Sequence, residues 1–252
     1  MIVERQKWFS RYRMSDEVKL QILCFPYAGG SESIYSKWID HIKGDIEIIA
    51  ICLPGRARRF TDPPHCSVVE LVNELFPDVE AILKKPYVIF GHSMGSKIGY
   101  ELLKKIVANN LTLPKKFIAS ACVAPSVNEQ DKSLWKMPDQ EFLEAVVAMN
   151  GIPEEVASNV KFMSFLTPML KNDFKMSCSY FDQCSPKLEV EAHVVYGTFD
   201  RLPEDHVSQW CMHFCGRTYF YPIEGDHFYI ENQRELFFKV INSILKTPNV
   251  ES

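Results

Sequence analysis

The sequence contains no long apolar run. No stretch reaches the roughly 20 consecutive apolar residues that a membrane-spanning helix needs. The first twenty residues, MIVERQKWFSRYRMSDEVKL, mix charged and apolar side chains and lack the apolar centre of a signal peptide. These absences predict a soluble, cytoplasmic protein without a membrane partner.

The sequence also lacks an excess of positive charge. Its 28 lysines and arginines stand against 32 acidic residues, which gives a formal net charge of −4. A protein that binds nucleic acid needs a basic surface to neutralise phosphates. We therefore expect no nucleic-acid partner.

Neither a disulfide framework nor a clear metal motif is present among the eight cysteines. Three of them lie in apolar runs, where free thiols commonly pack as small hydrophobic side chains: Cys24, Cys52 and Cys122. Cys211, His213 and Cys215 lie close together in WCMHFC, but no second ligand pair follows at a zinc-like spacing. The expectation is one helix face, with no metal and no other cofactor.

Short apolar runs alternate with longer helical patterns along the chain. Runs that are apolar nearly throughout are typical of strands buried on both faces of a parallel sheet; they span 18–25, 46–53, 87–91, 116–124, 191–197 and 217–223. Helical patterns span 33–43, 68–83 with an interruption at Pro77, 96–110, 203–214 and 231–246. The alternation predicts a doubly wound, mostly parallel α/β sheet in a single domain, residues 1–252.

Residues 126–186 break this alternation. They contain no strand-like run, only amphipathic pieces such as PDQEFLEAVVAMNGI and SNVKFMSFLTPMLKNDFKM. About sixty residues are too many for a connection between two core strands. The segment is predicted to form a helical lid.

The chemistry-bearing motif is GHSMG at 91–95. It directly follows the strand-like run 87–91 and opens a helix, as a nucleophile elbow requires. The tight turn strains the serine backbone, and Gly91 and Gly95 flank it because side chains there would collide. Ser93 is the predicted nucleophile.

A serine hydroxyl needs a base, and the base needs an orienting acid. In this architecture the order along the chain is serine, acid, histidine. Asp200 follows the run 191–197, and His227 follows the run 217–223, so both lie at the strand ends where open α/β sheets assemble their sites. The rival candidates lie in a helix, within a strand or beside His227: Asp205, His206, His193 and Asp226.

An acyl-transfer site also needs two N–H donors for the oxyanion. The backbone of Met94, directly after the nucleophile, is the first. The second is expected from the loop FPYAGG (25–30), whose glycines allow close approach of the backbone. Ala28 is the favoured donor and Tyr27 the alternative; an ordinary glycine turn is the competing interpretation.

Several blocks of the chain, in order, resemble those of type II thioesterases, the stand-alone editing α/β-hydrolases of nonribosomal peptide and polyketide assembly lines. Relatives include the medium-chain thioesterase of animal fatty acid synthase. The blocks are FPYAGG (25–30), LPGRARR (53–59), FGHSMG (90–95), MPDQEFLEAVVAMNGIPEEV (137–156), TPMLKNDF (167–174), GTFD (197–200) and GDHFY (225–229). The family often has a glycine where Asp226 stands, and 182–192 does not match closely.

The resemblance implies an α/β-hydrolase fold, Ser93 as nucleophile, Asp200 as acid, His227 as base and a lid at 126–186 over the acyl chain. It implies hydrolysis of acyl thioesters on the phosphopantetheine of acyl or peptidyl carrier proteins, with editing as the purpose. We expect a monomer. The alternatives are a hydrolase of free esters or acyl-CoA, and a binding module that has lost its chemistry.

Two further features bear on the substrate. The predicted lid holds five of the nine methionines, and such adaptable surface suits varied acyl groups, with about a third of the large side chains expected to face substrate; they are Met137, Met149, Met163, Met169, Met176, Trp135, Phe142, Phe162, Phe165 and Phe174. A basic cluster at Arg56, Arg58 and Arg59 is interpreted either as a contact for an acidic carrier protein or as a solvated loop.

Overall fold

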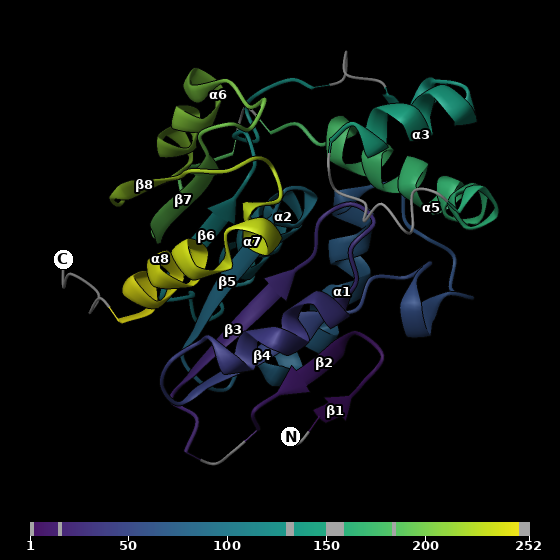
Figure 1. Ribbon diagram of the computed structural model, residues 1–252. Helices are drawn as coiled ribbons and strands as arrows, with labels where there is room; N and C mark the ends of the chain where they lie inside the picture. The colour runs from purple at the N-terminus through teal and green to yellow at the C-terminus, as the bar shows by residue number, and fades with distance from the viewer. Residues whose placement is uncertain (1–2, 15–16, 130–133, 150–158, 183–184, 247–252) are drawn as a thin grey trace.

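The computed structural model describes residues 3–14, 17–129, 134–149, 159–182 and 185–246, which form a three-layer α/β/α arrangement (Figure 1). The described strands form an eight-stranded sheet in the order β1-β2-β4-β3-β5-β6-β7-β8. Pairing is parallel from β4 to β8, while β1 and β2 are antiparallel. The strands are β1 (Val3–Arg5), β2 (Phe9–Tyr12), β3 (Leu20–Phe25), β4 (Ile46–Ile51), β5 (Tyr87–His92), β6 (Lys116–Ser120), β7 (Glu191–Gly197) and β8 (Thr218–Ile223). The predicted mostly parallel sheet is confirmed.

Helices cover both faces of this sheet (Figure 1). Alternate strand residues point to opposite sides, so that Leu23 joins the core beneath α1 and α2, whereas Ile22 joins the core beneath η1 and α8. The helical elements of the sandwich are η1 (Glu32–Asp40), η2 (Ala57–Arg59), α1 (Val68–Ile82), α2 (Met94–Ala108), α6 (Glu204–Ser208), η4 (Gln209–His213), α7 (Tyr229–Asn232) and α8 (Arg234–Lys246).

Two expectations about local structure are wrong. The helix α1 continues through Pro77; Leu75 and Val79 on either side are fully buried, and this packing outweighs the hydrogen bond that the proline removes. The first residues, in which no strand was predicted, form the hairpin of β1 and β2. Trp8, Phe9, Ser10 and Tyr12 are buried, and β2 lies between β1 and β4 in the sheet.

Between β6 and β7 the described chain contains helices and no strand. They are η3 (Leu134–Lys136), α3 (Asp139–Val147) and α5 (Val160–Ser179), and they lie beyond the carboxyl ends of the strands (Figure 1). Phe142 and Val146 of α3 pack against Leu170 of α5 in a separate small core. The parts of the predicted lid at 130–133, 150–158 and 183–184 lie outside the described residues.

The order in which the chain adds strands to the sheet changes direction at β3. From β3 the chain crosses to β4 on one side, and after α1 it returns to β5 on the other side. Such a switch point opens a crevice outside the carboxyl ends of the two strands, where open α/β sheets bind ligands. The loops after β3 and β5 therefore share one crevice.

Among the described residues no helix has the length and apolarity that crossing a bilayer requires.

A buried histidine on β7 makes the fold sensitive to acid. The Nε2 atom of His193 lies 2.7 Å from Glu191 Oε1, and its Nδ1 lies 3.0 Å from the Tyr221 hydroxyl. Burial lowers the pKa of His193 from 6.5 to about 4; Lys116 lowers it further and Glu191 acts in the opposite direction. The folded state thus favours a neutral ring.

Acidification from pH 7 to pH 5 is expected to lower the free energy of unfolding, by about 2 kcal/mol from His193 alone. The unfolded chain takes up this proton near pH 6.5, whereas the folded chain resists it down to about 4, so stability present above pH 6.5 is lost on the way down. Urea unfolding at a series of pH values measures the slope. His193→Gln should flatten it; identical slopes in both proteins would contradict the assignment.

Candidate active site

Ser93 sits on a strained turn between a strand and a helix. Strand β5 ends at His92, α2 begins at Met94, and Ser93 has φ 53° and ψ −121°. A Cβ atom on Gly91 would lie 2.2 Å from the Gly95 carbonyl oxygen, and one on Gly95 would lie 2.1 Å from the Phe25 oxygen. Both glycines are therefore required by backbone contact, and the elbow presses the start of α2 against the end of β3.

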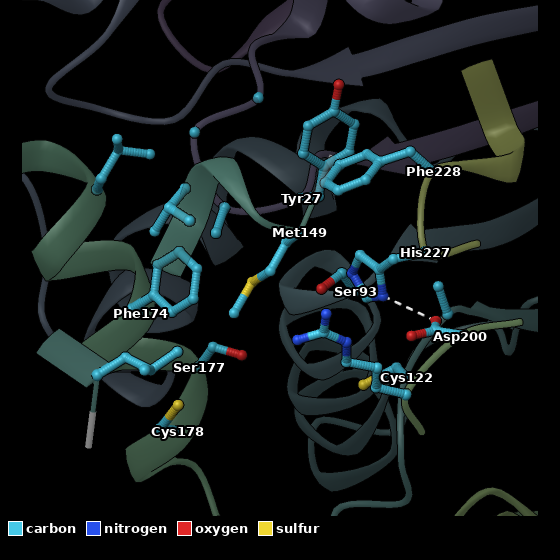
Figure 2. Close-up of a pocket in the computed structure, with 18 of the residues that line it drawn as sticks. Tyr27, Ser93, Cys122, Met149, Phe174, Ser177, Cys178, Asp200, His227 and Phe228 are labelled. Atoms are coloured by element: carbon cyan, nitrogen blue, oxygen red, sulfur yellow. Dashed lines mark hydrogen bonds and ion pairs between the residues drawn. The ribbon is translucent and has the colours of Figure 1, made fainter. Parts of the chain in front are cut away.

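His227 is held by Asp200. The His227 Nδ1 atom lies 2.8 Å from Asp200 Oδ2, and the Asp200 side chain is only 5% exposed. A carboxylate accepts the Nδ1 proton, so Nε2 is the ring nitrogen left to act as a base. Figure 2 shows the Ser93 hydroxyl on one side of the His227 ring and Asp200 on the other side. No hydrogen bond joins Ser93 to His227 in this structure; such bonds often tighten only when substrate binds.

The rival candidates are engaged elsewhere. Asp226, next to His227, accepts a hydrogen bond from the Phe228 backbone N–H at 2.9 Å through Oδ1. Asp205 and His206 are neighbours on α6, and His206 Nε2 lies 3.8 Å from Asp205 Oδ2. The structure thus brings Ser93, Asp200 and His227 to one place; Asp226 lies at the same cavity but does not bond to His227 Nδ1, which is held by Asp200.

The loop after β3 lies beside the elbow and offers backbone N–H groups. Gly29 N–H is already bound to Asp173 Oδ2 at 2.8 Å, and Gly30 N–H to the Tyr27 carbonyl at 2.9 Å. Among the described residues neither Ala28 N–H nor Tyr27 N–H has an acceptor. Met94, as the first residue of α2, has no partner for its N–H within the helix. These three N–H groups are the ones predicted from the sequence.

A cavity of about 580 Å³ connects these groups with α3 and α5. Ser93 and His227 lie on one side of it, and Met149 and Phe174 lie opposite (Figure 2). Of the ten large side chains singled out in the predicted lid, three line this cavity: Met149, Met169 and Phe174. Others are buried in the packing, among them Met163, Met176 and Phe142. The volume is that of a small-molecule pocket.

Comparison with known proteins assigns the chain to a family. The model of the thioesterase domain matches residues 20–245, which is most of the chain. The protein belongs to the thioesterase family. The resemblance stated from the sequence motifs is thereby confirmed.

Relatives of this thioesterase come from peptide and polyketide biosynthesis. The gramicidin S biosynthesis protein GrsT of Aneurinibacillus migulanus is 31% identical over 71% of this chain and 70% of its own length. Linear gramicidin dehydrogenase LgrE of Brevibacillus parabrevis is 28% identical and covers 97% of this chain and 95% of its own. The structure of the type II thioesterase BorB, from the borrelidin biosynthetic cluster, superposes with a TM-score of 0.88 at 26% identity, covering 96% of this chain and 99% of BorB. The α/β-hydrolase fold is confirmed.

An ion pair fastens the glycine loop of the thioesterase to α5. Arg56 donates from Nη1 to Asp173 Oδ2 and from Nη2 to Asp173 Oδ1, both at 2.6 Å. Asp173 is fully buried and also accepts the Gly29 N–H, while Arg56 donates to the Gly30 carbonyl at 3.3 Å. A bidentate, charge-assisted pair fixes both position and orientation. The loop conformation thus depends on a residue of α5.

The expectation of an exposed basic cluster is wrong for two of its three arginines. Arg56 and Arg59 are only 6% and 5% exposed. Arg59 stacks 4.0 Å above the Trp8 ring and pairs with Asp62 at 2.7 Å. Arg58 is an exposed residue, but its guanidinium donates to the Phe9 carbonyl at 2.8 Å and pairs with Glu32 at 3.4 Å. The arginines hold the loop 53–62 to the body of the enzyme, so they offer a carrier protein little free charge.

A second histidine, His92, contacts the backbone of His227. The Nε2 atom of His92 lies 3.0 Å from the His227 carbonyl oxygen, and its Nδ1 lies 2.9 Å from Ser120 Oγ. Burial, and then the charge of His227, lower the pKa of His92 well below its usual value. A neutral His92 that donates from Nε2 and accepts at Nδ1 satisfies both contacts. In the sequence this residue is only the variable position of the elbow motif, so nothing there indicated its role.

Proposed function

We propose that this protein hydrolyses acyl thioesters carried on the phosphopantetheine of carrier proteins, through an acyl-enzyme on Ser93. The supporting observation is the Asp200–His227 pair, whose Oδ2 and Nδ1 atoms lie 2.8 Å apart, beside an elbow serine at a cavity of about 580 Å³ in a thioesterase-family chain. Ser93 is the nucleophile, His227 the base and Asp200 its orienting acid. The segment 126–186 of this single domain is the lid over the acyl group.

The proposed reaction proceeds in two halves. The Ser93 oxygen attacks the thioester carbonyl while His227 Nε2 accepts its proton, and the N–H groups of Met94 and of Ala28 or Tyr27 bind the oxyanion. The intermediate collapses, and His227 gives its proton to the departing pantetheine thiol. Water, deprotonated by His227, then releases the acid. Because a thiol has a pKa near ~8.5, it leaves more readily than an amine, and little acid assistance is needed.

The relatives support an editing role on assembly lines. BorB and YbtT are both named type II thioesterases, YbtT from a yersiniabactin NRPS/PKS biosynthetic pathway, and YbtT is 28% identical with a TM-score of 0.80 over 91% of this chain and 94% of its own. We propose that the protein, a cytoplasmic monomer, acts on carrier-protein domains of such synthases and removes stalled or wrong acyl groups.

The test compares one set of acyl groups on two carriers. The same acyl chains are loaded onto holo carrier protein and onto coenzyme A, and kcat/KM is measured for each. We expect carrier-bound chains to be favoured about tenfold or more, since protein contacts add to those made with the acyl group. Equal values, or faster turnover of acyl-CoA or simple esters, would support the alternative hydrolase. A fluorophosphonate that fails to label Ser93 would support a binding module without chemistry.

A further inference from the structure

A charged residue is buried in the wall of the acyl cavity. Lys97 lies on α2, one helical turn beyond Ser93, and its side chain is 1% exposed. Lysine is almost never fully buried unless it is paired. Its ammonium donates to Glu129 Oε2 at 2.6 Å and to the Ser177 backbone carbonyl at 2.8 Å. All three residues line the cavity, and we refer to Lys97, Glu129 and Ser177 as the polar corner.

The polar corner retains hydrogen-bonding capacity. An ammonium has three N–H donors, and the structure gives Lys97 two acceptors. The Ser177 hydroxyl makes no hydrogen bond among the described residues, and Figure 2 shows it pointing into the cavity, with Cys122 on the far side. Much of the remaining wall is apolar, for example Val146, Leu166 and Leu170.

Charge balance decides which group fits there. Glu129 already neutralises Lys97, so a second carboxylate on the ligand would lie close to the Glu129 charge. The donors that remain, one ammonium N–H and one hydroxyl, match a neutral oxygen. We propose that the polar corner binds a hydroxyl, keto or amide oxygen on the acyl chain, and that the enzyme favours oxygen-bearing acyl groups over plain fatty acyl groups of equal length. The inference rests on the proposed role of Ser93.

The position of Lys97 places this oxygen near the thioester. Lys97 lies in the first turn of α2, which begins directly after Ser93, and helical side chains lean toward the N-terminus, here toward Ser93. The oxygen recognised therefore lies within the first several carbons after the carbonyl. A plain chain leaves a buried donor unpaired, which is how polar pockets reject apolar analogues.

The experiment measures a ratio within each protein, so a general loss of activity cancels. One carrier protein is loaded with hexanoyl, 3-hydroxyhexanoyl or 5-oxohexanoyl groups, and kcat/KM is measured for each. In the unmodified enzyme at least one oxygenated chain should exceed hexanoyl by about tenfold, the effect of one hydrogen bond to a charged group. In Lys97→Met/Glu129→Gln that advantage should disappear. Ser177→Ala, a milder change, should reduce it severalfold.

A matched control is available elsewhere in the chain. Lys116 is also a buried lysine, 3% exposed, bonded to a helix carbonyl, Ile244 O at 2.7 Å, and paired with Glu191 at 3.3 Å, but it is not part of the cavity wall. Lys116→Met/Glu191→Gln should leave the ratio unchanged. A preference for hexanoyl in the unmodified enzyme, or equal ratios in all variants, overturns the inference while hydrolysis of hexanoyl still supports the proposed function. If no carrier-bound chain is hydrolysed, the proposed function fails.

Discussion

Replacement of Ser93 by alanine is expected to lower kcat for thioester hydrolysis by about 10⁴- to 10⁶-fold, the scale on which serine hydrolases lose activity without their nucleophile. The change removes one oxygen from a side chain at the cavity, so folding should be unaffected. Release of acid from an acyl-carrier protein in single-turnover and steady-state assays measures the loss. A variant that keeps more than a few per cent of the activity would rule out an acyl-serine.

Ser93→Gly is the matched variant for this prediction. It removes the same oxygen, but it also removes the Cβ atom from a residue at φ 53°, a conformation that costs L-residues about 1–3 kcal/mol. After allowance for the flexibility of glycine in the unfolded chain, we expect it to be about 1 kcal/mol more stable than Ser93→Ala. Both variants should be equally inactive. Equal stability in urea unfolding would show that the turn stores no strain.

Removing Asp173 is the change with the second-largest expected effect. Asp173→Ala leaves the Arg56 guanidinium buried without its partner, and breaking such a pair typically costs about 3–5 kcal/mol. It also frees the Gly29 N–H, so the loop that we propose to offer an oxyanion donor loses its anchor. A misplaced donor costs up to about 10²-fold in kcat. We expect kcat to fall with little change in KM, because the oxyanion forms only in the transition state.

Stability and catalysis can be separated with a double variant. Arg56→Met/Asp173→Leu removes both charges and should recover most of the stability, since apolar replacement of a whole buried pair is often neutral. It cannot recover the contacts to Gly29 and Gly30, so kcat should stay low. Arg11→Met/Glu47→Leu, which removes the pair between β2 and β4, serves as control and should keep kcat. Full recovery of kcat in the first double variant would mean that the pair has only a structural role.

Much of the architecture could be predicted from the sequence because it is encoded locally. Runs such as IEIIAI and YVIFGH are apolar nearly throughout, and both form strands buried on each face. The elbow was predictable because its constraint is local: Gly91 and Gly95 are needed by backbone atoms that lie within a few residues or on the adjacent strand. The order of the catalytic candidates along the chain then placed Asp200 and His227 at neighbouring strand ends.

The long-range polar contacts could not be predicted in this way. Arg56 and Asp173 are 117 positions apart, and Lys97 and Glu129 are 32 apart; in each case a charged residue reads as a surface residue until its partner is known. The same limit explains the wrong interpretation of the arginine cluster, because the buried face of Trp8 that covers Arg59 belongs to a hairpin that the sequence pattern did not indicate.

Helix α5 has two tasks that limit how the cavity can open. It lines the acyl cavity with Leu166, Leu170 and Phe174, and it holds the glycine loop through Asp173. An outward movement of α5 would break the Arg56–Asp173 pair and release the Gly29 N–H. The glycine loop would then lose the contacts that fix its conformation. An acyl chain that entered by displacing α5 would therefore meet a glycine loop without its Asp173 contact until the helix returned.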